Sequence, residues 1–232
     1  MTPVHAQALP PGQHESASFP RFGTWLYAHY RPHDDLPRAL ELRGDVAREI
    51  TLENALDGLP RREQTSDFHC VTTWSRRALR WGGVRFSDFY EQVIEVQARP
   101  HPGAKFLVLR AQDGYRSVLL LEDLLRPDVL LADQLDGQPL TAEHGAPLRL
   151  IAPAQYGYKS VKHLSRIEPR VQAPAYRPAM LAFMDHPRAR VALEERGRWV
   201  PGWLLRRLYR PLIAPTVKRF ARTPPEHPLD HS

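Results

Sequence analysis

The chain has 232 residues, which is enough for one large domain with a substantial core, or for one domain with an appendage. Hydrophobic residues make up 42% and charged residues 25%, values typical of globular proteins, and the 23 prolines favour a strand-rich fold with many loops over a helical bundle. The formal net charge of +6 arises at one end, because residues 170–232 hold 12 Lys and Arg but 5 Asp and Glu, and this uneven distribution excludes a uniformly basic nucleic-acid-binding protein.

The cysteine count and the hydropathy pattern indicate where in the cell the protein is expected. Cys70 cannot form an internal disulfide, which fits a reducing cytoplasm. Residues 1–20 lack a basic cluster followed by an apolar core, so we expect no secretory signal there. No apolar run approaches the roughly 20 residues that a membrane-spanning helix needs. We therefore expect a soluble, cytoplasmic protein.

Taken in chain order, the sequence predicts an arm, a β-rich domain and a helical extension. Residues 1–37 are rich in proline and histidine and are interpreted as an extended arm that wraps the domain. Within 38–169, apolar runs and alternation predict strands at 39–45, 65–72, 83–86, 105–112, 115–121, 129–131, 148–152 and 161–167. Capping residues and spacing predict helices at 51–58, 88–97 and 122–125. Short strands interleaved with short helices indicate an α+β fold built mainly on sheet.

The extension, residues 170–232, has a different pattern. Apolar residues recur at helical spacing between arginines, which predicts an amphipathic helix at 201–210. Pro211 and Pro215 are expected to break or kink it before a second segment at 216–222. Such a helix packs on its own domain or on a second copy of the chain; a basic amphipathic helix also suits a membrane surface or an acidic partner.

Four segments combine apolar, cationic and glycine residues in a pattern unusual for surface loops. Cys70 lies in the run Asp67-Phe68-His69-Cys70-Val71-Thr72-Thr73-Trp74-Ser75, and the other three segments follow it: Trp81-Gly82-Gly83-Val84, His144-Gly145-Ala146-Pro147-Leu148-Arg149 and Gln155-Tyr156-Gly157-Tyr158-Lys159-Ser160-Val161-Lys162. In this order and spacing, over about 42–168, they resemble the sulfite oxidase-like family of molybdopterin-dependent oxidoreductases. Sulfite oxidases usually have arginines where Trp74 and Ser75 stand, so the sequence is more similar to the methionine sulfoxide reductase catalytic subunit branch.

The resemblance implies a β-rich, sulfite-oxidase-type molybdopterin-binding fold with a helical C-terminal extension. It also implies that molybdenum is ligated by Cys70, the only protein ligand, with His69 beside it in a supporting role. Tyr115 stands where the family places an active-site tyrosine, although Asp-Gly-Tyr is also an ordinary hairpin turn. Five further residues match positions that bind the pterin and its phosphate: His144, Arg149 and Ser160-Val161-Lys162, with Val161 included through its segment.

The implied activity is a two-electron oxygen-atom transfer on a small S- or N-oxide substrate. The sequence has no haem, iron–sulfur or dinucleotide-binding motif, so electrons are expected to come from a separate partner. Two alternatives stay open beside this reading: a non-catalytic molybdenum-cofactor-binding or interaction protein, and a cysteine hydrolase with His144 or His163 as its base. A lone cysteine is also common as a small packing residue.

Overall fold

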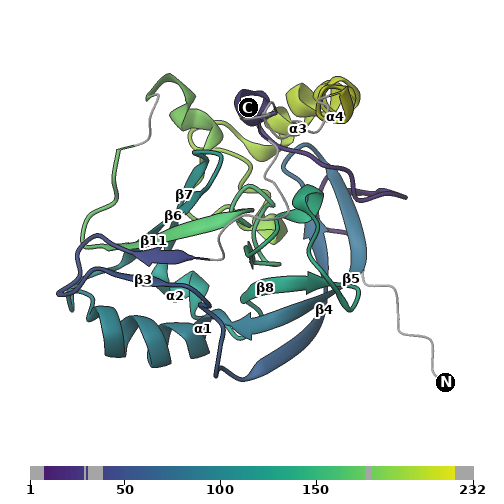
Figure 1. The fold of residues 1–232 in the computed structure, drawn as a ribbon. Coiled ribbons are helices and arrows are strands. Elements are labelled where there is room, and N and C mark those ends of the chain that lie inside the picture. The colour runs from purple at the N-terminus through teal and green to yellow at the C-terminus, as the bar shows by residue number, and fades with distance from the viewer. Residues whose placement is uncertain (1–7, 29, 31–38, 176–178, 223–232) are drawn as a thin grey trace, which may run out of the picture.

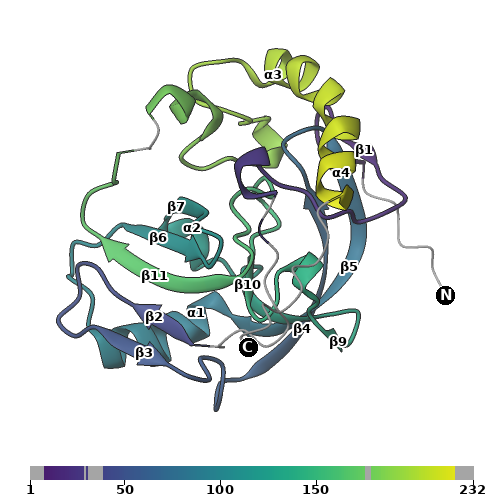
Figure 2. The same ribbon diagram turned by 45° about the horizontal axis from the view of Figure 1, so that its top comes forward.

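The computed structural model describes residues 8–28, 30, 39–175 and 179–222. Two β-sheets dominate these residues, and short helices connect or cover them (Figure 1). A view turned by 45° shows the last two helices, α3 (Gly202–Tyr209) and α4 (Ile213–Arg222), at the outer edge of the molecule near the long strand of the first sheet (Figure 2). In the part of the chain that is described, no helix has both the length and the apolar character to cross a bilayer.

The first sheet supplies the strands on which most of the predicted site residues lie. Its six strands are β1 (His14–Glu15), β4 (Arg61–His69), β5 (Trp74–Arg85), β8 (Leu130–Leu135), β9 (Gln138–Pro139) and β10 (Arg149–Ile151). The 12-residue strand β5 pairs antiparallel with β4 and β8, and β8 in turn pairs with β9 and β10. β1, from the N-terminal arm, runs parallel to the start of β5. The arm is therefore part of the sheet.

The second sheet has the strand order β3-β2-β11-β6-β7. Its strands are β2 (Leu40–Leu42), β3 (Ile50–Leu52), β6 (Phe106–Ala111), β7 (Arg116–Leu120) and β11 (Leu164–Arg170). The pair β2–β11 is parallel and the other pairs are antiparallel. The hairpin β6–β7 turns at Asp113-Gly114, where Gly114 has a φ of +84° that a glycine adopts without strain.

The main core takes side chains from both sheets and from the helical segment that follows β5. That segment begins as α1 (Phe86–Phe89) and continues as a π-helix, η2 (Tyr90–Ala98). Along β8 the side chains alternate, so Leu131 lies in the main core while Leu130 lies in a second cluster with Trp81. The remaining short helices are η1 (Trp25–Tyr27), α2 (Leu121–Leu124), η3 (Ala142–His144), η4 (Ala179–Met184), η5 (Val191–Leu193) and η6 (Arg210–Leu212).

The sheet-dominated α+β architecture confirms the predicted fold class, and two local predictions are wrong. Thr51 was expected to cap a helix over 51–58, but it lies in β3, because Ile50 and Leu52 pack against the main core and the strand pairs with β2. Pro215 was expected to interrupt the last helix, yet it lies in the first turn of α4, where a missing N–H removes no intrahelical hydrogen bond. Pro211 does separate the two helices, within η6.

Candidate active site

Cys70 directly follows β4, in a tight connection to β5. Its N–H donates to the Trp74 carbonyl at 2.8 Å, and its own carbonyl accepts from the Thr73 N–H at 3.1 Å. Thr73 has a φ of +90°, which lets the four residues 70–73 reverse the chain between two long strands. The side chain of Gln13, from the arm, donates to the Cys70 carbonyl at 3.1 Å. The backbone of Cys70 is thus fixed from both sides.

The thiol of Cys70 is buried among polar groups. Its Sγ lies 3.1 Å from Thr72 Oγ1. Burial raises the pKa of the Cys70 thiol, while the hydrogen bonds with Thr72 and the positive charges of Arg196 and Lys162 act in the opposite direction. The surroundings of this cysteine are therefore cationic and hydroxyl-bearing, unlike those of a cysteine that fills an aliphatic core.

A relay of three side chains supports the cysteine loop. Ser75 donates its hydroxyl proton to Gln13 Oε1 at 2.9 Å, and Ser75 Oγ lies 2.8 Å from His69 Nδ1. Because the one hydroxyl proton is used toward Gln13, the Nδ1–H of His69 is assigned as the donor to Ser75. Burial also lowers the pKa of His69, which favours the neutral form of its ring. His69 thus contacts Ser75 within the cysteine loop, and its supporting role beside a metal ligand stays a prediction.

Close backbone packing brings the segment 155–162 against the cysteine strand. The Gly157 N–H donates to the His69 carbonyl at 2.7 Å. A Cβ at Gly157 would lie 2.2 Å from the Phe68 ring, so only glycine allows this approach. The segment that contains Ser160 and Lys162 is held beside Cys70 in this way.

Arg149, the first residue of β10, is fully buried. Its Nη1 donates to the His144 carbonyl at 2.6 Å, and its guanidinium lies over the rings of Trp81 and Phe68, 5.0 and 5.6 Å from their centroids. Nε and Nη2 are buried and have no hydrogen-bond partner among the described residues. Burial lowers the pKa of Arg149 to about 9. Two buried cationic donors therefore remain available to an anionic group.

Lys162 lies beside Arg149. A Cβ at Gly145 would approach the Lys162 and Arg149 side chains at 3.1 and 3.3 Å, and Gly145 has a φ of +107°, so a glycine is needed where the two cations meet. Lys162 Nζ donates to the Glu143 carbonyl at 3.1 Å. Burial, followed by the positive charges of Arg149 and Arg21, lowers the pKa of Lys162 to about 7.

Ser160 and Val161, the neighbours of Lys162, have structural contacts. Ser160 Oγ accepts the Ala152 N–H at 3.2 Å, and Val161 is buried in the main core. The Leu150 N–H donates to the Val161 carbonyl at 2.9 Å, which ties this segment to β10. These two residues set the position of Lys162 relative to Arg149.

His144 ends the short helix η3, and its ring stacks on Phe19 of the arm, with centroids 4.9 Å apart and planes 7° apart. Burial, with the positive charge of Lys162, lowers the pKa of His144. His163, the other candidate base, has Nδ1 2.7 Å from the Ala146 carbonyl, and burial lowers its pKa to about 4. The recorded partner of the Cys70 thiol is Thr72, and no histidine contact to that thiol is found among the described residues.

Tyr115 lies in the turn before β7. Its hydroxyl donates to the Tyr158 carbonyl at 2.6 Å, and its ring packs edge-on against Tyr27 of the arm at 5.5 Å. The preceding turn is closed by the Tyr115 N–H, which donates to Asp113 Oδ1 at 2.8 Å. Tyr115 is thus both a turn residue and a neighbour of the segment that contains Lys162.

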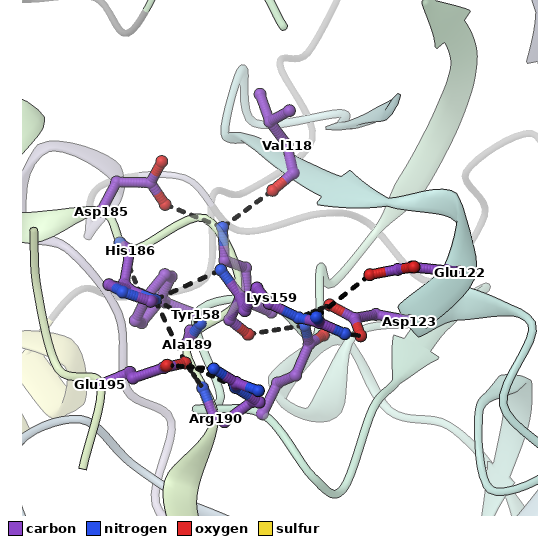
Figure 3. A network of polar contacts seen from close by, with 12 residues as sticks. Val118, Glu122, Asp123, Tyr158, Lys159, Asp185, His186, Ala189, Arg190 and Glu195 are labelled. Carbon is purple, nitrogen blue, oxygen red and sulfur yellow. Dashed lines mark hydrogen bonds and ion pairs between the residues drawn. The ribbon is translucent and has the colours of Figure 1, made fainter. Parts of the chain in front are cut away.

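Figure 3 shows a polar network that anchors the extension to the same segment. Lys159 is fully buried, and its Nζ donates to Asp185 Oδ1 at 2.9 Å and to the Val118 carbonyl at 2.8 Å. Arg190 forms a two-point ion pair with Glu195, with contacts of 2.6 and 3.0 Å. The residues after 185 are therefore fixed next to Lys159, which immediately precedes Ser160.

Sequence reasoning missed several contributors because they come from the two ends of the chain. Arg196 is fully buried, donates to the Val71 carbonyl at 2.5 Å and lies over the Tyr156 ring at 4.9 Å. Gln13 reaches the cysteine loop from the other end. No local motif marks either residue, since their contacts span more than 50 positions. The contact of Thr72 with the thiol could have been suspected from its position two residues after Cys70.

The chemistry of the site fits a cofactor that brings its own metal ligands and an anionic tail. Among the described residues no group of three or more His, Cys, Asp or Glu could hold a metal ion, so a metal at Cys70 requires non-protein ligands. Molybdopterin supplies sulfur ligands together with a phosphate. Cys70 would offer the protein thiolate, and the free donors of Arg149 with Lys162 suit the phosphate. The residues present fit the group.

Comparison with known proteins agrees with this chemistry. Residues 32–175 match the family described as oxidoreductase molybdopterin binding domain. The uncharacterized oxidoreductase YuiH of Bacillus subtilis (strain 168) is 36% identical over 162 residues, which span 69% of this chain and 78% of that protein. The protein-methionine-sulfoxide reductase catalytic subunit MsrP of Xanthomonas campestris pv. campestris is 26% identical over 186 residues, which span 69% of this chain and 57% of that protein.

The crystal structure of the sulfane dehydrogenase SoxCD from Paracoccus pantotrophus has the same fold, with a TM-score of 0.54 and 21% identity over 64% of this chain and 42% of that one. The predicted family and fold are confirmed by these matches. The family match covers more than half of the sequence. The chain therefore belongs to the molybdopterin-binding oxidoreductase family, as an enzyme with the sulfite oxidase-like fold and a molybdopterin cofactor.

Proposed function

We propose that this enzyme catalyses two-electron oxygen-atom transfer on a small S- or N-oxide, with molybdenum ligated by Cys70. For a sulfoxide the balanced reaction takes two electrons and two protons and gives a sulfide and water. The name of the Xanthomonas relative, a methionine-sulfoxide reductase subunit, favours a sulfoxide substrate. Since the chain spans little more than half of that relative, substrate and electron donor are part of the proposal.

The observation that carries the proposal is the pairing of a buried thiol with a buried, incompletely satisfied cation. Arg149 lies over Phe68, two residues before Cys70, and keeps two donors without partners among the described residues. A buried guanidinium with unpaired donors destabilises the fold unless an anion pairs with it. A cofactor that carries both a sulfur-bound metal and a phosphate would give the Cys70 thiol a metal to bind and the Arg149 donors an anion.

Each site residue has a part in this proposal. When bound, the cofactor supplies the two-electron change and the oxygen-atom transfer. Cys70 would hold the metal, while His69 and Ser75 keep the cysteine loop rigid. Arg149 and Lys162 would hold the phosphate, with His144, Ser160 and Val161 shaping that end of the site. Tyr115, whose hydroxyl is fixed to the Tyr158 carbonyl, would position the segment before Lys162.

The test combines metal analysis with turnover. The purified protein should contain molybdenum and should oxidise reduced viologen in the presence of sulfoxides or N-oxides. Cys70→Ser should keep the fold and lose activity by at least about a hundredfold, because a hydroxyl is a poor soft ligand. Thr72→Val, which alters the contact to Sγ and keeps the thiol, should lose much less. Molybdenum without turnover on any oxide would favour the non-catalytic cofactor-binding protein.

A cysteine hydrolase is the less favoured function. Burial raises the pKa of the Cys70 thiol, whereas a nucleophilic cysteine needs a lowered one. His163 donates its Nδ1–H to the Ala146 carbonyl, and its pKa of about 4 does not suit a base at neutral pH. A protein that purifies without molybdenum and hydrolyses esters through Cys70 would restore this alternative.

The proposal includes a separate electron-transfer partner and a cytoplasmic location. The partner follows from the absence of any haem or iron–sulfur motif in the sequence, and the location from the lack of a disulfide framework. Cell fractionation with compartment markers tests the location, and recovery of the protein with a periplasmic or extracellular marker would contradict it.

A further inference from the structure

The C-terminal helices present an apolar ridge to solvent. Leu204 and Leu208 are one helical turn apart on α3, and Leu212 follows them in η6. All three are exposed, Leu208 to 59%. On the adjacent face of α3, Leu205 and Tyr209 are buried against the domain. The helix therefore has two apolar faces, and one of them is left uncovered by the described residues.

Aromatic and cationic side chains flank this ridge. Trp203 is half exposed and Trp199 is 75% exposed. Each indole has an arginine over it, with Arg207 5.9 Å from the Trp203 centroid and Arg198 5.7 Å from the Trp199 centroid. We call the ridge and its flanks the α3 face, which consists of Trp199, Trp203, Leu204, Arg207, Leu208, Arg210 and Leu212.

The electrostatics of the α3 face have one sign. Residues 196–222 contain seven arginines and one lysine and no aspartate or glutamate. Arg207 and Arg210 are exposed, and neither forms an ion pair with a described residue. The occupant of such a surface must therefore be anionic as well as partly apolar.

The face is held firmly, and it lies outside the family domain. Thr216 of α4 accepts a hydrogen bond from the Trp25 indole at 2.7 Å, and Arg206 of α3 pairs with Glu194 at 3.3 Å. The family match ends at residue 175, whereas α3 begins at Gly202. The extension thus adds a fixed surface to the shared domain.

We propose that the α3 face binds the surface of an anionic lipid bilayer. A helix at the outer edge of the molecule can lie flat in a bilayer interface, whereas a protein partner would need a matching groove (Figures 1 and 2). Tryptophans favour the headgroup level, leucines enter the acyl boundary, and arginines attract anionic headgroups. The same cations would repel one another across a dimer of two α3 faces.

The test is co-sedimentation of the full chain with vesicles, which does not depend on turnover or on the proposed function. Vesicles of phosphatidylcholine with about 30% phosphatidylserine should bind the protein and shift its tryptophan fluorescence to the blue. Binding should fall at least about tenfold on pure phosphatidylcholine, and also in about 0.5 M NaCl, because the attraction is partly electrostatic.

Two pairs of variants assign the binding to the face. Leu208→Asp and Arg207→Glu/Arg210→Glu should each weaken binding at least about tenfold. The matched controls are Val96→Asp, on an equally exposed apolar residue of η2, and Arg48→Glu/Arg62→Glu, which makes the same charge change elsewhere; both should bind as the unmodified protein does. Equal thermal midpoints would show that all four variants fold.

Three outcomes would overturn the proposal. They are absence of binding to phosphatidylserine vesicles, binding that Leu208→Asp leaves unchanged, and a concentration-dependent dimer that Leu208→Asp dissociates while vesicles do not bind. The last result would assign the face to a second copy of the chain. Capture of a soluble acidic protein by the face, without vesicle binding, would count equally against a lipid surface.

Discussion

At the residue scale, the most demanding group in the molecule is Arg149. It is fully buried, its one recorded hydrogen bond goes to the His144 carbonyl, and the remaining contacts are the faces of Phe68 and Trp81. Folding alone does not require a cation there, since an apolar side chain of similar length would fill the same space between two rings. A bound anion would give this buried arginine a partner for its two remaining donors.

Replacement of Arg149 by methionine should therefore separate binding from folding. Arg149→Met preserves volume against the two rings and removes a partly unsatisfied buried charge, so resistance to urea of the metal-free protein should be no lower. Molybdenum per protein, measured by elemental analysis, should fall at least about tenfold. Arg166→Met, at an exposed arginine paired with Glu41, is the control and should keep full metal content. Full molybdenum content in Arg149→Met would refute the phosphate assignment.

Lys162 predicts a pH dependence of cofactor binding. Its pKa is lowered to about 7 in the structure, and a neighbouring phosphate would raise it. Binding then favours the protonated lysine, so affinity should be greatest below pH 7 and should fall as the pH rises above 7, by up to about tenfold per unit. Reconstitution titrations between about pH 6 and 8.5 measure this. Lys162→Met should bind more weakly, with a flat profile; a slope that survives the substitution would assign the titration to another group.

The sequence predicted which residues belong to the candidate site better than it predicted which residues contact one another there. The sequence contains local motifs that include Cys70, Arg149 and Lys162. These residues could therefore be proposed as site residues from the sequence alone. Gln13 and Arg196 could not, because they reach the cysteine loop from positions 57 and 125 residues away. The roles of the predicted site residues stay predictions until the variants above are measured.

At the element scale, alternation patterns were reliable where a strand has one face in the core. Residues 105–112 and 115–121 were expected as a hairpin and form β6 and β7, because period-2 burial and an Asp-Gly turn agree there. The helix predicted to begin at Thr51 was wrong. The capping residue favoured a helix locally, but the packing of Ile50 and Leu52 against the main core favours a strand. The π-helical form of η2 had no sequence signal that we recognise.

The buried pair Lys159–Asp185 predicts how the extension is fastened to the domain. Lys159→Met leaves the Asp185 carboxylate nearly buried without its cation, so the free energy of unfolding should drop by about 3 kcal/mol. The double variant Lys159→Met/Asp185→Leu should recover much of that loss, because both charges are gone. Urea denaturation gives the values. Arg80→Met, from an exposed pair 4.0 Å from Asp136, is the control and should change stability by less than about 1 kcal/mol. Equal effects of the two single variants would mean that the buried pair is not an anchor.

At the scale of the whole molecule, the two ends of the chain meet over the candidate active site. β1 pairs with β5 beside Cys70, and Phe19 stacks on His144. The arm is in turn held by α4, where Phe220 is buried under Arg21 at 5.2 Å and Thr216 binds the Trp25 indole. Of the arm predicted for residues 1–37, the structure describes residues 8–28 and 30, which contact the domain through β1 and Phe19. Its dependence on the last helix was not foreseeable, because no local pattern links positions 25 and 216.

This arrangement makes the reactivity of Cys70 a measure of how well the extension holds the arm. Cys70 is the one cysteine in the chain, so the reaction of metal-free protein with a chromogenic disulfide reports on that thiol alone. Burial and a raised pKa should make the reaction slow in the full chain. Deletion of residues 200–232 removes the contacts of Thr216 and Phe220 with the arm, frees Gln13 to leave the cysteine loop, and should raise the rate at least about tenfold. Leu208→Asp, which changes the exposed α3 face and keeps those contacts, should leave the rate unchanged. A truncated chain that reacts as slowly as the full one would mean that β1 pairing with β5 holds the arm without the extension.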